Sequence, residues 1–80
     1  MILVTGATGL VGSYLLLHLL ENEKNVRAIY RNSESLENTR AFFKLQNKAH
    51  FFDSVEWMQA DITDVTKLKK VFIGVKFVYH

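Results

Sequence analysis

The sequence contains no cysteine, and its three histidines are scattered along the 80 residues. Without cysteine the chain can form neither disulfides nor thiolate metal sites. His18, His50 and His80 lie too far apart in sequence to form a metal-ligand spacing. We therefore expect no metal site.

The chain also lacks a large excess of positive or negative charge, because the formal net charge is +2 and the charged residues are dispersed. Nucleic-acid binding is therefore not indicated. The one local basic cluster is interpreted as the solvent-facing side of a helix; it comprises Lys67, Lys69 and Lys70. The apolar segment from Leu10 to Leu20 is shorter than the ~20 residues that span a bilayer, and we expect no signal peptide before Ile2. We expect a cytoplasmic protein with no membrane partner.

The composition is that of a soluble globular protein, with 49% hydrophobic and 22% charged residues. A chain of this length buries only a little over ~60% of its unfolded surface and is marginally stable alone. We therefore expect at most one small domain.

Three of the four glycines stand in one motif, Thr5-Gly6-Ala7-Thr8-Gly9-Leu10-Val11-Gly12. An apolar run precedes it and a strongly apolar segment follows, which is the strand–turn–helix context expected of a phosphate-binding loop. We expect Gly6 to permit a tight turn, Gly9 to admit a pyrophosphate, and Gly12 to let the helix lie close to the strand. Helix N–H groups and the helix dipole would face the anion. The motif predicts a dinucleotide site; the alternative is a glycine-rich turn without a ligand.

This motif resembles the TGxxGxxG signature of short-chain dehydrogenases/reductases, rather than the G-x-G-x-x-G of the ordinary Rossmann fingerprint. The resemblance is strongest to the extended subfamily, which includes nucleotide-sugar epimerases and dehydratases, dihydroflavonol-type reductases and 3β-hydroxysteroid dehydrogenases. It continues through residues 26–31, 60–64 and 78–80, in the family's order. The loop residues assigned to cofactor binding are Gly6, Thr8, Gly9, Leu10, Val11 and Gly12.

Strands and helices are expected to alternate along the whole chain. The expected helices are 10–21, one after residue 33 and 64–73, and the expected strands are 2–4, 26–30, 55–60 and 76–80. Such alternation implies right-handed crossovers and a parallel sheet of order 3-2-1-4. We therefore predict the N-terminal βαβαβαβ portion of a doubly wound, Rossmann-type α/β fold, with pyrophosphate in the crevice between strands one and four.

Some finer expectations concern individual residues. In the first helix, Val11, Leu15 and Leu19 are expected to mark the buried face, which Leu16 and Leu20 widen. The aromatic residues of the middle are more often core than cofactor contacts; they are Phe42, Phe43, Phe51, Phe52 and Trp57. His50 and Asp53 are interpreted as loop residues. Helix caps are expected at Ser33 or Ser35, and at Thr63, with Gly74 ending the last helix.

The residue at the end of the second strand decides between NAD and NADP, because it meets the adenosine ribose. An acidic side chain there would bind the 2′-hydroxyl, but this sequence has Arg31. A guanidinium presents a planar fork of donors that suits a phosphate. Arg31 therefore favours NADP, and NAD is the alternative cofactor. The alternative role for Arg31 is that of a solvated side chain stacked on the adenine.

The resemblance also assigns the residues after the third strand. It implies that Asp61 accepts a hydrogen bond from the adenine amino group and that Ile62 lies along the purine ring. A carboxylate is a suitable acceptor for that amine. The alternative is that Asp61 only ends the strand.

The family's catalytic Tyr-x-x-x-Lys motif does not occur in this sequence, since Tyr14 and Tyr30 are followed four positions later by His18 and Glu34. We assign no catalytic residue. Residues 1–80 are expected to be part of an NAD(P)-binding Rossmann domain, with catalytic and substrate-binding parts beyond them. The intact protein would be an oxidoreductase or epimerase that moves hydride between NADP(H) and a carbonyl or alcohol substrate, with a homodimer as one expected assembly. The alternative is a non-catalytic redox sensor or regulator of the NmrA type.

Overall fold

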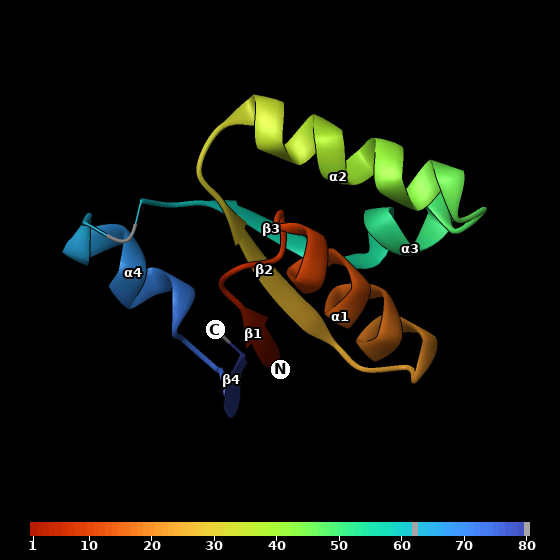
Figure 1. Cartoon of the computed structure of the whole chain (residues 1–80). Helices are drawn as coiled ribbons and strands as arrows, with labels where there is room; N and C mark the ends of the chain where they lie inside the picture. Colours follow the sequence, from red (N-terminus) through yellow and green to blue (C-terminus); the bar gives the residue numbers. More distant parts are fainter. Residues whose placement is uncertain (62, 80) are drawn as a thin grey trace.

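The computed structural model describes residues 1–61 and 63–79, and it contains a four-stranded sheet (Figure 1). The strand order is β3-β2-β1-β4, and each neighbouring pair is parallel. The strands are β1 (Ile2–Val4), β2 (Val26–Tyr30), β3 (Glu56–Gln59) and β4 (Phe77–Tyr79). The predicted fold class and strand order are therefore confirmed.

Helices cover both faces of this sheet, in the manner of a doubly wound fold. They are α1 (Leu10–Glu21), α2 (Ser33–Leu45), α3 (Ala49–Ser54) and α4 (Val65–Val71). Figure 1 shows α1, α2 and α3 together on one side of the sheet and α4 on the other. No helix among residues 1–61 and 63–79 is long and apolar enough to cross a membrane.

Successive strand residues point to opposite faces and so build two separate cores. On the first face, Val4 and Ala28 pack with the buried side chains of α1 and with Phe43 and Phe52. On the second face, Leu3 and Ile29 pack with Val71 of α4. Because the central strands are buried on both sides, they are apolar at almost every position.

The aromatic residues of the middle belong to the first core, as predicted. Phe43 and Phe52 are buried, with ring centroids 6.0 Å apart. Helix α3 brings Phe52 to this position, and it occupies a stretch that was expected to be a loop. That expectation was wrong because Asn47, with φ of 57°, reverses the chain directly after α2 and lets a second short helix begin. His50 and Asp53 are exposed on α3.

The buried face of α1 differs from the prediction in its first turn. Val11 is 82% exposed and Ser13 is buried, whereas Leu16 and Leu20 are buried as expected. The rotation of the helix follows from Gly12, which lies against the preceding loop and turns the face of residues 12, 13, 16 and 20 inward. Leu19 is buried as expected.

Two helix caps were assigned to the wrong residues. Asn32, rather than Ser33 or Ser35, caps α2 by accepting from the Ser35 N–H. Asp64, rather than Thr63, caps α4 by accepting from the Lys67 N–H at 3.1 Å. Thr63 is engaged instead with Asp61, as described below.

Candidate dinucleotide-binding site

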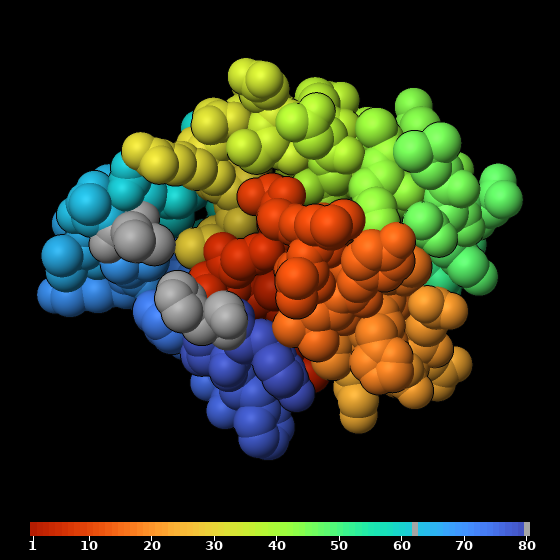
Figure 2. All heavy atoms as spheres, viewed as in Figure 1, coloured from red at the N-terminus to blue at the C-terminus, as the bar shows by residue number. Residues whose placement is uncertain are grey.

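The glycine motif forms the loop between the carboxyl end of β1 and the start of α1. In Figure 2 its red atoms reach the surface between α2 in yellow and the C-terminal strand in blue. Gly12 is held tightly there, because a Cβ added to it would overlap the carbonyl oxygen of Gly6. Only glycine allows the first turn of α1 to lie this close to the loop.

Gly6 and Gly9 have open space where a side chain would stand. A Cβ on Gly6 would meet no atom within 4 Å, and one on Gly9 would make only an ordinary contact of 3.6 Å. Neither glycine has a positive φ. The backbone conformation at Gly6 therefore does not require glycine, contrary to the expectation of a tight turn there. What these two glycines leave is an uncovered stretch of main chain that a ligand can approach.

The first turn of α1 presents backbone N–H donors to the same region. Gly9 is the N-cap and supplies no side-chain cap, and the first turn holds no acidic residue. The N–H groups of Leu10, Val11 and Gly12 therefore have no intrahelical acceptor. With the positive end of the helix dipole behind them, these donors suit a phosphate.

Ser13 fixes the loop against the helix, a role that was not recognised in the sequence. Its hydroxyl is buried and donates to the carbonyl of Ala7 at 2.9 Å. The only signal in the sequence is a small polar residue on an otherwise apolar helix face. Thr5 extends the same framework, because its N–H donates to the Tyr79 carbonyl at 2.9 Å and thereby ties the loop to β4.

Two cavities flank the loop on either side of β1. The β1/β4 cavity, of about 400 Å³, lies at the predicted crevice and is mostly apolar; it is lined by Val4, Gly6, Gly9, Leu10, Val11, Gly12, Leu15 and Tyr79. The β2/β3 cavity, of about 190 Å³, is more polar; it is lined by Thr5, Thr8, Ile29, Tyr30, Arg31, Ala60 and Asp61. The two cavities, which we call the groove, together lie over the carboxyl ends of all four strands.

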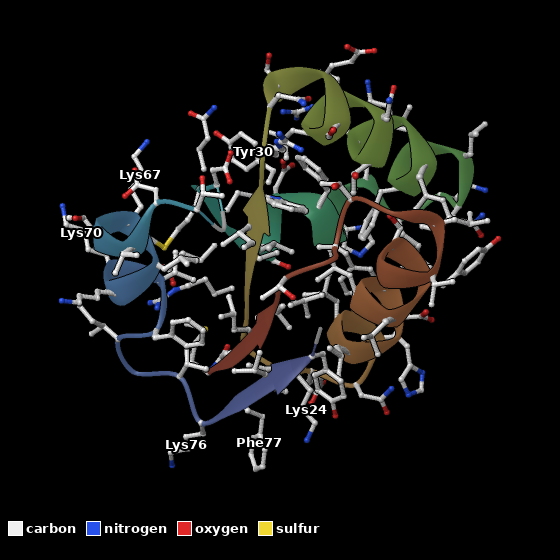
Figure 3. The ribbon with its side chains drawn as sticks, turned by 60° about the vertical axis from the view of Figure 1, so that its left-hand side comes forward. Lys24, Tyr30, Lys67, Lys70, Lys76 and Phe77 are labelled. Carbon is white, nitrogen blue, oxygen red and sulfur yellow. The ribbon has the colours of Figure 1, made fainter. Side chains whose placement is uncertain are left out.

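Arg31 and Asp61 come together in the β2/β3 cavity, since they follow the adjacent strands β2 and β3. Arg31 Nε lies 3.8 Å from Asp61 Oδ2, and the Arg31 side chain is 80% exposed. Figure 3 shows Tyr30, the residue before Arg31, at the carboxyl end of β2. The two residues assigned to the adenosine end of the cofactor therefore share one cavity.

Thr63 holds the carboxylate of Asp61 from the other side. Both its N–H and its hydroxyl donate to Asp61 Oδ1, each at 2.9 Å. These two bonds, and to a smaller extent the Arg31 guanidinium, lower the pKa of Asp61 below its ordinary value. The carboxylate is therefore an ionised acceptor at neutral pH.

Arg27 ties β2 to the C-terminal end of α4, and this role was also not recognised in the sequence. Its Nη1 donates to the carbonyls of Val71 and Ile73 at the end of α4, each at 2.6 Å, and its Nε lies 3.2 Å from Glu56 Oε2. A charged residue within an apolar strand was the available signal.

Lys67, Lys69 and Lys70 are exposed on α4, as predicted, and Lys67 and Lys70 point outward in Figure 3.

The predicted cofactor residues thus fall into two groups along the groove. Gly6, Thr8, Gly9, Leu10, Val11 and Gly12 form the central loop and its flanks, and Arg31 and Asp61 form the outer end. Ile62 lies outside the described residues. Within the described part of the chain, no three His, Cys, Asp or Glu side chains gather as a metal site would require.

Known proteins are similar to this chain over most of its length. Residues 3–80 match the family described as GDP-mannose 4,6 dehydratase. The chain is 39% identical over 75 residues to the human GDP-mannose 4,6 dehydratase, which covers 92% of this chain and 20% of the relative. It is 29% identical over 79 residues to the dihydroflavonol 4-reductase of Hordeum vulgare, covering 99% of this chain and 22% of the relative.

The chain therefore spans about a fifth of the length of the curated relatives it matches. The matched residues include the glycine loop, Arg31 and Asp61, which together line the groove. This chain belongs to the GDP-mannose 4,6 dehydratase family, within the extended short-chain dehydrogenase/reductase superfamily.

Proposed function

We propose that residues 1–80 form the dinucleotide-binding part of an NAD(P)-dependent oxidoreductase or epimerase/dehydratase. The observation that carries the proposal is the glycine loop, in which Gly12 is required by packing while Gly6 and Gly9 leave the main chain open. A turn that served only to connect β1 with α1 would not need the open main chain that Gly6 and Gly9 leave beside the helix N-terminus.

Each part of the groove has a role in this proposal. The loop and the N–H groups of Leu10, Val11 and Gly12 bind the pyrophosphate. The β2/β3 cavity takes the adenosine, with Asp61 accepting from the adenine amine and Arg31 meeting the 2′-phosphate of NADP. The β1/β4 cavity, with Leu10, Leu15 and Tyr79 in its wall, lies on the opposite side of the loop and takes the nicotinamide half.

The bound nicotinamide would supply hydride transfer to or from a carbonyl or alcohol substrate. The residues of this chain orient the dinucleotide and exclude water from its pyrophosphate. Acid–base chemistry would come from residues beyond position 80 of the intact protein, because no Tyr-x-x-x-Lys occurs among the 80 residues.

The direct test is a calorimetric titration of the intact protein with NADP and with NAD. We expect saturable binding at one site per chain, with NADP preferred. The Gly9→Val variant should lose binding of both dinucleotides while retaining its fold, because the new side chain occupies space that only the ligand would use. Thr66→Val, at an exposed position of α4, is the control and should bind as the wild type does.

Two results would contradict parts of the proposal. Equal binding by Gly9→Val and the wild type would remove the loop from the site. If the intact protein lacks a Tyr-x-x-x-Lys pair and binds the dinucleotide without transferring hydride, the proposed enzyme activity would be wrong. The function would then be that of a dinucleotide sensor.

A further inference from the structure

Arg31 and Asp61 form a pair in the proposed adenosine site, and each of them would bind a different part of the same dinucleotide. The 2′-phosphate of NADP would bind the Arg31 guanidinium, and the adenine amine would bind the Asp61 carboxylate. In the structure these groups lie 3.8 Å apart, and both line the β2/β3 cavity. The two recognition events are therefore coupled through the pair.

The partners of Asp61 determine which of its oxygens is shared. Oδ1 already accepts two hydrogen bonds from Thr63, which fill its two acceptor positions. Oδ2 is the oxygen that faces Arg31. An amine entering the cavity is thus directed to the same oxygen that attracts the guanidinium.

The geometry also shows how firmly Arg31 is held. A separation of 3.8 Å is longer than a hydrogen bond, so the pair rests on charge attraction rather than on a directed bond. A phosphate can instead accept two parallel bonds from the guanidinium fork. A 2′-phosphate would therefore draw Arg31 away from Asp61, whereas the neutral 2′-hydroxyl of NAD would leave the pair in place.

We propose that Asp61 sets the preference of this site between NADP and NAD through Arg31, because its carboxylate competes with the 2′-phosphate for the guanidinium. Asp61 is a specificity-determining residue in addition to its contact with adenine. The inference rests on the proposed function, since it requires that the groove bind a nicotinamide dinucleotide.

The test is a double-mutant cycle in the intact protein. Dissociation constants for NADP and NAD are measured by calorimetry, at one ionic strength, for the wild type, Asp61→Asn, Arg31→Gln and the double variant. Asparagine keeps the side-chain shape and an oxygen that can accept from Thr63 or from adenine. Glu37→Gln is the matched control, because it removes a carboxylate from an exposed pair with Arg40 on α2, outside the β2/β3 cavity.

We expect Asp61→Asn to raise the preference for NADP over NAD by roughly twofold to fivefold, a modest change because exposed ion pairs are weak. In the Arg31→Gln background the same substitution should leave the preference unchanged. Thr63→Val separates charge from turn geometry, because it removes one bond to the carboxylate and keeps its charge. We expect Thr63→Val and Glu37→Gln both to leave the preference unchanged.

Three outcomes would overturn the inference. The first is an unchanged preference for NADP over NAD in Asp61→Asn. The second is an equal change of that preference with and without Arg31, which would mean that Asp61 repels the phosphate directly. The third is a change of the preference in Thr63→Val equal to that in Asp61→Asn. Failure of the wild type to bind either dinucleotide would instead overturn the proposed function itself.

Discussion

Gly12→Ala offers the sharpest test of how the glycine loop is built. The added Cβ would overlap the carbonyl oxygen of Gly6 and would lie 3.1 Å from the Cα of Ala7. Both neighbours are backbone atoms, so relief requires the loop or α1 to move rather than a side chain to rotate. Overpacking of this kind costs ~3 kcal/mol at the upper end of its usual range. Alanine regains ~1 kcal/mol of helix propensity over glycine, which leaves a net loss of about 2 kcal/mol.

Gly6→Ala is the matched control, because its Cβ would meet nothing within 4 Å and Gly6 has no positive φ. Its stability should stay within ~0.5 kcal/mol of the wild type, as for other substitutions that make no new contact. Urea denaturation of the intact variants, followed by circular dichroism, measures both values. Equal midpoints for Gly12→Ala and the wild type would refute the close packing of α1 on the loop.

Four further outcomes are expected. Ser13→Ala should lower the free energy of unfolding by ~1–2 kcal/mol, since it leaves the buried carbonyl of Ala7 without its donor; an unchanged urea midpoint would contradict this. Arg27→Met should cost ~2–3 kcal/mol and speed amide exchange in α4, because the last carbonyls of that helix lose a charged donor. The Asp61 carboxyl should titrate below its ordinary value of 3.8 in an NMR titration, and Thr63→Val should raise that midpoint. Because the folded pKa is the lowered one, this group stabilises the fold above the unfolded pKa and loses that effect as pH falls through the folded value. Residues 1–80 expressed alone should self-associate in sedimentation, since the outer edge of β4 carries exposed apolar side chains; a stable monomer would count against this.

The strand order could be predicted because the local signals agree with the global fold. Apolar runs such as Val26–Tyr30 alternate with helical patterns, and alternation of this kind leaves few parallel topologies. The bounds of α1, Leu10–Glu21, follow from the glycine motif before it and the polar residues after it. These features are local, so one sequence is enough to read them.

What could not be predicted depends on contacts between distant residues. The apolar pattern of α1 correctly indicated that Leu19 is buried, but the exposure of Val11 and the burial of Ser13 are set by the packing of Gly12 against the loop. The helix Ala49–Ser54 depends on Phe52 packing against Phe43, and the cap at Asp64 depends on Thr63 being taken by Asp61. In the site, Arg31 and Asp61 were each assigned a role, but their pairing appears only once β2 and β3 are adjacent.

The glycine loop and the groove beside it are proposed to bind a nicotinamide dinucleotide. A calorimetric titration of the folded, intact protein with NADP and then with NAD tests this binding. We expect saturable binding at one site per chain, lost for both ligands in Gly9→Val. A folded wild-type protein that binds neither dinucleotide would contradict it.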